Sequence, residues 1–249
     1  MIKLDNVTKI FNKGQANEVR AIEELSLTIN PQEYVVIVGA NGSGKSTLLN
    51  LVAGSIRPTS GEIILDGQTV TRLADYERSR WIARVFQNPL SGTAPDLSIL
   101  DNFRLAALRT RSKGFGIGTT AVFKKQVQEK VATLGMELEN KLEQPMGTLS
   151  GGQRQALTLL MSVMDECRIL LLDEPTAALD PRSANLVMEA ANQLIDTFKL
   201  TAILITHNLK DAHNYGNRLI QMGEGCILQD FATVNKLNLT QNKIFEWFS

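Results

Sequence analysis

The sequence predicts an α/β fold, in which a parallel sheet is preceded by antiparallel strands and interrupted by a helical insertion. Strand-like and helix-like segments alternate over most of the chain, and this favours a parallel sheet with right-handed crossovers. Short, unbroken apolar runs at 34–38 and 169–172 are typical of buried strands. The stretch 88–145 is mostly helix-like, so we predict one domain, 1–249, whose core is made by 1–87 and 146–249.

The antiparallel part is predicted at the start of the chain. Residues Ile2–Val7 and Ala21–Ile29 alternate apolar and polar side chains, as half-exposed strands do. A polar turn at Asn12–Gln15 separates them, and Pro31 closes the second strand. Phe11 stands at the end of the first strand, where its ring could either stack on an adenine base or pack locally.

The middle of the chain predicts short elements separated by turn residues. A strand at Gly61–Asp66 leads into the hairpin-forming dipeptide Asp66-Gly67, and Arg84–Gln87 is predicted to end another strand. The basic, glycine-rich connector 111–118 is predicted to be a solvated loop, with contact to a partner or to lipid head groups as the alternative. The loop predicted here is Pro89–Asp96. The predicted helices are Ala74–Ala83, Ser98–Arg109 and Thr119–Leu134.

The second half continues the alternation of strands and helices. Gly151–Met164 is mostly apolar and predicts a buried helix, whereas Asp180 and Pro181 open a helix that extends to about Phe198. The tail Ile244–Phe248 has helix-like apolar spacing and either docks on the body or frays. The remaining predicted elements are a strand at Thr201–Ile205, a helix that ends near Tyr215, and a hairpin of Arg218–Met222 with Cys226–Gln229.

Bulk composition gives no support for a nucleic-acid-binding, cysteine-metal or membrane-spanning protein. The 26 Lys and Arg residues balance 26 Asp and Glu residues, so no global charge favours nucleic acid or an anionic membrane surface. The cysteines, Cys167 and Cys226, have no metal-ligand spacing and predict a reducing compartment. The first residues do not resemble a signal peptide, and no apolar run approaches the roughly 18 residues of a spanning helix. We therefore expect another chain to bring this protein to any membrane on which it acts.

One motif organises the sequence. Gly39–Thr47 fits the phosphate-binding pattern G-x-x-x-x-G-K-[ST], between the predicted strand 34–38 and a helix that Gly54 ends. Backbone N–H groups at the start of a helix attract anions because they have no intrahelical partner. We expect Lys45 to reach the β- and γ-phosphates and the Ser46 hydroxyl to ligate Mg²⁺. The expected nucleotide contacts come from Gly39, Asn41, Gly42, Ser43, Gly44, Lys45, Ser46 and Thr47.

Further chemically active side chains stand at the ends of predicted strands. Asp173 is expected to hold Mg²⁺, and Glu174 to act as the general base for an attacking water or to orient that water. The alternative is that this acidic pair only caps a helix. His207 could donate a hydrogen bond to a γ-phosphate or be a structural histidine. Gln87 could contact both Mg²⁺ and the attacking water.

A second anion site is predicted at Leu149–Gln155. This loop-to-helix junction carries a hydroxyl and two glycines, but no lysine and no metal-binding partner, so it cannot hold a whole nucleotide. A chain with one full site and one half site suggests pairing across two copies. The expected contacts are Ser150, Gly151, Gly152 and Gln153.

Taken in order, these motifs resemble the sequence marks of an ABC-transporter ATP-binding subunit. The marks are Gly39–Thr47, Gln87, Leu149–Gln155, Asp173-Glu174, Ala177–Asp180 and His207. The resemblance implies an ATPase that forms a head-to-tail dimer with two ATP molecules at the interface. Ser150 and Gly152 of one copy would then face the nucleotide held by the other copy. It also implies that Phe11 stacks on adenine, a position that is more often tyrosine.

A finer resemblance is to ATPase components of bacterial importers of amino acids, including aromatic ones. It is carried by Val85–Pro89, Gly92–Pro95, Ser150–Leu160 and Asp173–Asp180. The implied partners are a second ATP-binding subunit, transmembrane permease subunits and, indirectly, a substrate-binding protein, with the chain peripheral on the cytoplasmic face of a bacterial membrane. The alternatives are the ATPase of an exporter or envelope-remodelling system, and a soluble ABC ATPase without a transport role. The last is disfavoured because the chain shows neither a long coiled coil nor a second cassette.

Overall fold

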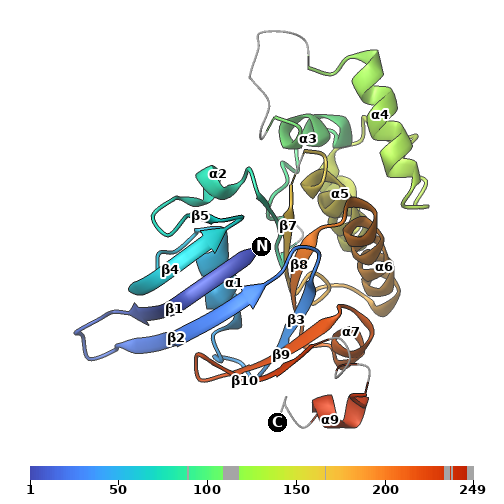
Figure 1. Cartoon of the computed structure of the whole chain (residues 1–249). Coiled ribbons are helices and arrows are strands. Elements are labelled where there is room, and N and C mark those ends of the chain that lie inside the picture. The colour runs from blue at the N-terminus through green and yellow to red at the C-terminus, as the bar shows by residue number, and fades with distance from the viewer. Residues whose placement is uncertain (89, 109–117, 166, 233–235, 237, 246–249) are drawn as a thin grey trace.

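The computed structural model describes residues 1–88, 90–108, 118–165, 167–232, 236 and 238–245. Within these residues the strands form two sheets (Figure 1). The first sheet is antiparallel in the order β2-β1-β4-β5, as the alternating pattern at the start of the chain predicts. Its strands are β1 (Ile2–Phe11), β2 (Val19–Ile29), β4 (Ser60–Leu65) and β5 (Gln68–Thr69).

The second sheet has the order β10-β9-β3-β8-β7-β6 and is parallel except for its edge strand β10. Residues 34–38 of β3 and 169–172 of β7 are all buried, which confirms the two predicted buried strands, and every residue of β8 is buried as well. The strands of this sheet are β3 (Tyr34–Val38), β6 (Ile82–Val85), β7 (Ile169–Asp173), β8 (Thr201–Ile205), β9 (Arg218–Gly223) and β10 (Cys226–Phe231).

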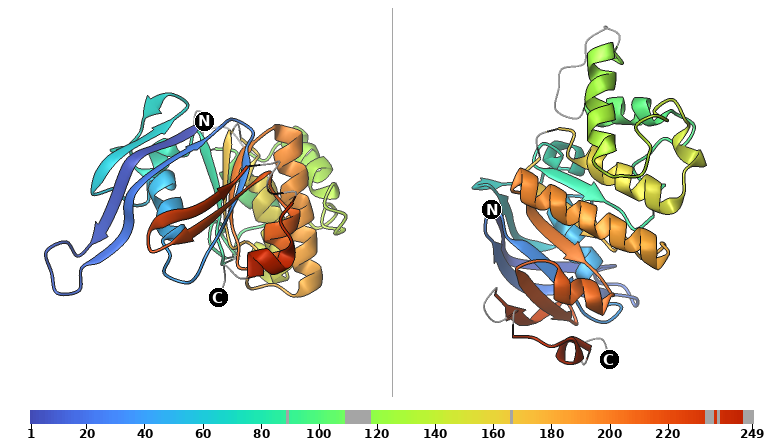
Figure 2. Two further views of the ribbon diagram at one scale, coloured as in Figure 1. Left: turned by 60° about the horizontal axis from the view of Figure 1, so that its bottom comes forward. Right: turned by 90° about the vertical axis from the view of Figure 1, so that its right-hand side faces the viewer.

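Helix α1 (Lys45–Ala53) lies between the two sheets (Figure 2). Along β3, Val35 and Ile37 join the apolar cluster that contains α1 and the first sheet, whereas Val36 and Val38 join the cluster on the other face. This alternation follows from the period of two in a strand. The parallel sheet is therefore packed on both faces, and α1 covers one face only.

The other face of the parallel sheet carries the remaining long helices. Helices α5 (Gly151–Ser162) and α6 (Pro181–Phe198) pack against each other on this face, and their apolar residues share one core cluster with Val36 and Val38. Beyond α5, helices α3 (Ile99–Ala106) and α4 (Ala121–Ala132) form a projecting lobe (Figure 2). The shorter helical elements are α2 (Asp75–Arg78), η1 (Met146–Thr148), α7 (Leu209–Asn214) and α9 (Gln241–Phe245).

One predicted helix is wrong in its extent. Helix α2 covers only Asp75–Arg78 of the predicted Ala74–Ala83, because Ile82 and Ala83 belong to β6. Ile82 and Ala83 pair in parallel with β7 and are buried, so pairing in the sheet overrides the local helical pattern. The connector 111–117, Pro89 and the end of the tail lie outside the described residues, but Ile244 of α9 is fully buried, so the described part of the tail docks.

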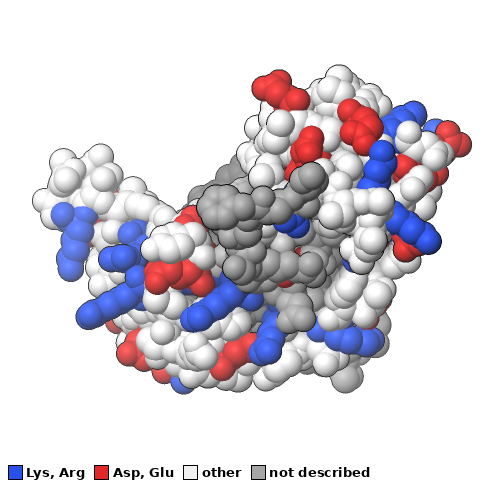
Figure 3. Space-filling view, turned by 90° about the horizontal axis from the view of Figure 1, so that it is seen from above, with Lys and Arg blue, Asp and Glu red and all other residues white. Residues whose placement is uncertain are grey.

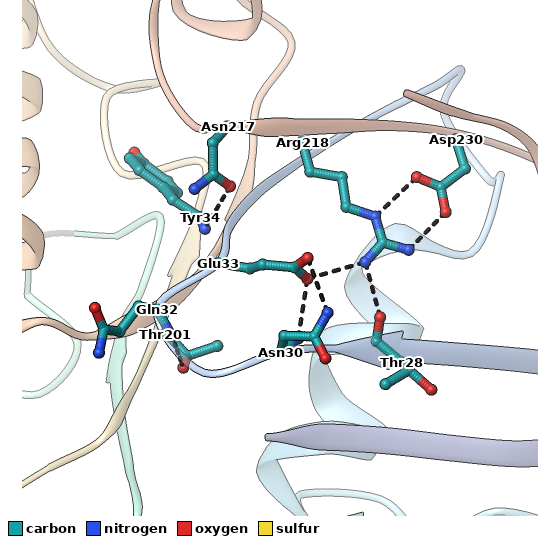
Figure 4. A network of polar contacts seen from close by, with 9 residues as sticks. All are labelled: Thr28, Asn30, Gln32, Glu33, Tyr34, Thr201, Asn217, Arg218 and Asp230. Carbon is teal, nitrogen blue, oxygen red and sulfur yellow. Dashed lines mark hydrogen bonds and ion pairs between the residues drawn. The ribbon is translucent and has the colours of Figure 1, made fainter. Parts of the chain in front are cut away.

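A polar network ties the β9–β10 hairpin to the first sheet (Figure 4). The Arg218 guanidinium donates to both carboxylate oxygens of Asp230, at 2.8 and 2.6 Å, and to the Thr28 carbonyl at 2.8 Å. It also pairs with Glu33 at 3.0 Å, and Glu33 in turn accepts from Asn30. The network fixes the position of β9, which lies beside the strand that precedes the phosphate-binding motif.

Candidate nucleotide-binding site

The glycine loop runs from the end of β3 to the start of α1 and packs tightly on neighbouring backbone. A Cβ on Gly39 would lie 2.1 Å from the Met222 carbonyl oxygen, and one on Gly44 would lie 2.6 Å from that of Ala21. Both glycines also have positive φ angles, of 147° and 99°. Only glycine fits at these positions, because any side chain would collide with β9 or β2.

The N-terminus of α1 is open. Its N-cap residue is Gly44, which provides no side-chain cap, so the first backbone N–H groups of the helix have no acceptor within it. Ser46 is exposed and Thr47 is half-buried at this end. The helix dipole and these N–H groups together favour an anion here.

Lys45 is buried beside the open helix end. Its Nζ donates to the carbonyl oxygens of Gly39 and Ala40, both at 2.8 Å, and to Ser43 Oγ at 3.3 Å. Burial lowers the pKa of Lys45, against the opposing effect of the nearby Glu174 and Asp173 carboxylates. The lysine therefore forms its hydrogen bonds with its own loop. Within the described contacts, its charge has no carboxylate partner.

The carboxyl ends of the parallel strands gather the predicted catalytic side chains at one edge of the sheet. His207 follows β8, and its Nε2 lies 2.6 Å from Glu174 Oε1. Gln87 follows β6, and its Nε2 donates to Glu174 Oε2 at 3.4 Å. The structure thus brings Gln87, Glu174 and His207 together, with one Glu174 oxygen directed to each partner.

The backbone of Glu174 is in the left-handed region, with a φ of 47°. This conformation costs about 1–3 kcal/mol for a residue other than glycine, and such costs concentrate at functional sites. The Glu174 N–H donates to the Ile205 carbonyl at 3.0 Å, which fixes the turn that follows β7. A cavity of about 570 Å³ opens beside Glu174 and His207, and burial raises the pKa of Asp211 in its lining.

Arg84 is a site residue that the sequence analysis missed. It projects from β6, and its Nη2 forms an ion pair with Asp173 Oδ2 at 2.8 Å. Its Nη1 donates to Asn50 Oδ1 of α1 at 2.7 Å. The available signal was a single charged residue within an otherwise apolar strand. Its importance depends on β6 pairing with β7, which no local pattern reveals.

The second predicted anion loop caps helix α5. Ser150 Oγ accepts from the Gln153 N–H at 3.3 Å, and Gln153 Oε1 accepts from the Ser150 N–H at 3.2 Å, so the two side chains form a capping box. A Cβ on Gly152 would lie 2.5 Å from the Cβ of Ser183 on α6, and this contact requires glycine there. Gly151 is less constrained, with its nearest neighbour, a Leu179 methyl, at 3.2 Å.

This second loop does not join the first one within the chain. Helix α5 packs with α6 on the face of the parallel sheet opposite to α1. Ser150–Gln153 therefore belongs to a different layer from Gly39–Thr47. Phe11 ends β1 on the first sheet, where it is 36% exposed and Lys9 Nζ lies 4.9 Å from its ring centre.

Two further residues couple the second loop to its surroundings. The Arg154 guanidinium donates to the carbonyls of Gly147 and Leu149 at 3.0 Å, which holds the loop before α5. Gln155 is fully buried, and its Nε2 donates to the Phe86 carbonyl at 2.9 Å. The N-terminal turns of α5 are thus hydrogen-bonded to the residue before Gln87.

Oxygen donors make the first site suitable for Mg²⁺. The Ser46 hydroxyl, the Asp173 carboxylate and the Gln87 amide are hard ligands of the kind that this ion prefers. No group of three or more His, Cys, Asp or Glu side chains in the described ranges could hold a metal by itself. Mg²⁺ that accompanies a nucleotide takes most of its ligands from phosphate and water, so one carboxylate and one hydroxyl fit it.

An open helix end after a glycine loop, with an acidic pair at the exit of β7 in the same sheet, is typical of a nucleotide-hydrolysing α/β cassette. The family model for ABC transporters matches residues 22–177. The chain therefore belongs to the ABC transporter family and is an ATPase that hydrolyses ATP for transport.

Relatives and solved structures agree with this family. The chain is 38% identical to the tyrosine transport ATP-binding protein of Clostridioides difficile strain R20291, over 100% of this chain and 98% of that protein. It is 33% identical to the phosphonates import ATP-binding protein PhnC of Rhizobium meliloti strain 1021, over 92% of this chain and 81% of that protein.

Among solved structures, a dimeric post-hydrolysis state of the ATP-binding cassette MJ0796 bound to ADP and Pi matches with a TM-score of 0.79 at 29% identity, covering 94% of this chain and 99% of that one. The ADP conformation of the cassette MJ1267, at 23% identity and a TM-score of 0.79, covers 96% of this chain and 93% of that one. The second likeness shows the fold alone.

Proposed function

We propose that this chain is the ATPase subunit of an importer for an amino acid, with tyrosine or a similar aromatic amino acid as the substrate class. The support is the 38% identity to a tyrosine transport ATP-binding protein over nearly the full length of both chains. Other relatives are also import proteins, such as the phosphonate import protein at 33% identity. The proposal agrees with the motifs around Val85–Pro89 and Ser150–Leu160.

Binding of ATP uses the open end of α1. The phosphates lie along the Gly39–Thr47 backbone, including Asn41 and Gly42, and Lys45 exchanges its bonds to the Gly39 and Ala40 carbonyls for phosphate oxygens. Phe11 stacks on the adenine. Ser46, Asp173 and Gln87 would hold Mg²⁺, which would supply positive charge against the phosphates.

Hydrolysis uses the three side chains that meet at Glu174. Glu174 takes the proton from a water whose oxygen forms a bond to the γ-phosphorus, while the bond from that phosphorus to the bridging oxygen breaks and ADP leaves. Before ATP binds, the 2.6 Å contact with His207 Nε2 holds the Glu174 carboxylate in one orientation. His207 donates to the γ-phosphate, and Gln87 positions the water, because its amide already lies 3.4 Å from Glu174.

The arrangement of two copies is inferred from the fact that α1 and α5 cover opposite faces of the parallel sheet. A nucleotide on Gly39–Thr47 therefore cannot meet Ser150–Gln153 of the same chain. We infer a head-to-tail dimer in which each ATP lies between Gly39–Thr47 of one copy and Ser150, Gly151, Gly152 and Gln153 of the other. The dimeric cassette MJ0796, which is similar over 94% of this chain, supports the pairing of two copies.

The partners follow from the role in transport. Permease subunits receive the motion of the helical insertion 88–145, and a substrate-binding protein delivers the amino acid from outside. None of the helices among the described residues is long and apolar enough to cross a membrane. Positive and negative side chains are interspersed on the face seen in Figure 3. We place the subunit on the cytoplasmic face of a bacterial membrane, attached to its permease.

The test is uptake by the source strain with this gene deleted. We expect uptake of labelled tyrosine to fall and to return with the wild-type gene, but not with a gene that encodes Glu174→Gln. Labelled leucine and methylphosphonate serve as controls and should be unaffected. Normal uptake of tyrosine by the deletion strain would contradict tyrosine import. Faster accumulation of tyrosine after deletion would indicate an exporter.

A further inference from the structure

Arg84 is a charged residue in a strand that is otherwise apolar. It lies opposite Leu171 in the β6–β7 pairing, between the buried residues Ala83 and Val85. The exposed fraction of its side chain is 13%. A guanidinium withdrawn from water to this degree is costly unless it is held by polar partners.

The polar partners of Arg84 come from two other elements, and an aromatic ring comes from the residue just after its own strand. Nη2 contacts Asp173 Oδ2 of β7 at 2.8 Å, Nη1 contacts Asn50 Oδ1 of α1 at 2.7 Å, and the Phe86 ring lies 4.7 Å from the guanidinium carbon. Asn50 and Phe86 would hold the guanidinium in place even without Asp173. A planar guanidinium directs its N–H groups along fixed lines, so a fixed guanidinium also fixes the carboxylate that it contacts.

The contact with Asp173 engages a single carboxylate oxygen. Within the described contacts, Arg84 bonds to Oδ2 alone, which leaves Oδ1 available to another ligand. The fixed contact at Oδ2 thus leaves Oδ1 to receive a cation beside the nucleotide phosphates.

We propose that Arg84 is a positioning residue that holds the Asp173 carboxylate in the orientation in which it receives the Mg²⁺ of bound ATP. The inference rests on the proposed role of Asp173 at the metal. Hydrogen-bonding partners of metal ligands contribute about 10–100-fold to metal affinity. The opposite possibility, that Arg84 competes with Mg²⁺ for Asp173, requires the guanidinium to leave, and its contacts with Asn50 and Phe86 oppose that.

The experiment is a Mg²⁺ titration of binding of a fluorescent ATP analogue to purified Arg84→Met protein. We expect the Mg²⁺ concentration for half-maximal effect to rise by about tenfold or more. Affinity for the analogue in EDTA should stay unchanged, since none of the described contacts of Arg84 is with Gly39–Thr47. Arg84→Lys keeps the charge but cannot reach Asn50 and Asp173 together, so its shift should be intermediate.

Controls separate this inference from the proposed function. Arg80→Met removes an exposed arginine nearby, which stacks on Trp81, and should leave the titration unchanged. Asp173→Asn should shift the titration at least as far as Arg84→Met. If Asp173→Asn has no effect, the proposed metal role of Asp173 fails; if it shifts and Arg84→Met does not, the Arg84 inference fails.

Tighter Mg²⁺ binding by Arg84→Met would overturn the inference in favour of competition. Asn50→Leu is the second variant, in case Arg84→Met does not fold, because it removes only the anchor on α1. We expect a shift in the same direction and of smaller size. An unchanged titration for both Arg84→Lys and Asn50→Leu would also refute the positioning role.

Discussion

The N-termini of α1 and α5 are chemically similar in sequence but differ in the structure. The start of α1 follows Gly44, has no side-chain cap and leaves its backbone N–H groups available to an anion. The start of α5 follows Ser150, whose hydroxyl and the Gln153 amide satisfy the same kind of groups through a capping box. One helix end is open before any ligand arrives, and the other is closed by its own side chains.

This difference explains the expected division of labour between the two loops. An open end with a buried lysine can bind a triphosphate in a single copy, because no existing bond to a side-chain cap must be broken. In the proposed dimer, the capped end of α5 would have to share Ser150 and its N–H groups with a phosphate that the other copy presents. We therefore expect ATP binding to need one copy, and hydrolysis to need two.

Glu174→Gln should give the largest effect, because it stops the reaction while both helix ends remain intact. We expect hydrolysis to fall by about 10²–10⁴-fold, the usual contribution of a general base. ATP binding should be retained and an ATP-dependent dimer should accumulate. Phosphate release and light scattering measure the two effects, and ordinary turnover by this variant would remove Glu174 from the role of base.

Lys45→Ala tests the open end alone. The lysine offers at least two charge-assisted hydrogen bonds, each worth about 1.5–3 kcal/mol, so affinity for ATP should fall by about a hundredfold or more. Isothermal titration with ATP and Mg²⁺ measures this loss. Unchanged ATP affinity would show that the phosphates do not use Lys45.

Gly152→Ala tests how α5 is seated on α6. The new methyl group would lie 2.5 Å from the Ser183 Cβ, and overpacking of this kind costs about 1–3 kcal/mol. We expect an unfolding free energy lower by that amount and hydrolysis reduced by about tenfold, with single-copy ATP binding preserved. The double variant Gly152→Ala/Ser183→Gly should restore much of the hydrolysis; no restoration would mean that the glycine is needed for the ligand rather than for packing.

Ser150→Ala should give the smallest effect and separates the cap from the ligand role. Loss of an N-cap costs about 1 kcal/mol of stability. Thr120→Ala is the matched control, since Thr120 caps α4 by accepting from the Phe123 N–H at 3.2 Å. We expect similar losses of stability in chemical denaturation, but a several-fold loss of hydrolysis for Ser150→Ala only. Equal hydrolysis by the two variants would falsify a role of Ser150 beyond capping.

The sequence predicts the fold well where the pattern is local. The apolar runs 34–38 and 169–172 are buried parallel strands, and the β1–β2 alternation gives the antiparallel sheet. The predicted end of the helix at Ala83 is wrong because Ile82 and Ala83 belong to β6, where they pair with β7, a strand distant in sequence. Propensity is weak against such burial.

The features of the site fall into the same two groups: residues that a local motif predicts, and contacts that depend on strand order. The motifs predict Lys45, Glu174 and His207 as site residues, since each stands at a strand exit or in the phosphate loop. The motifs cannot show that Glu174 contacts both His207 and Gln87, or that Arg84 holds Asp173, because these contacts depend on strand order. The glycine at 152 had a predicted role at the anion loop, and the Ser183 contact adds a packing reason.

The most direct measurement is the position of Ser150 in a structure of the Glu174→Gln protein with ATP and Mg²⁺. Our account predicts two ATP molecules between opposed copies, with each Ser150 Oγ within hydrogen-bonding distance of the γ-phosphate bound to the other copy. An ATP fully enclosed by one copy, with every Ser150 remote from all phosphates, would contradict it.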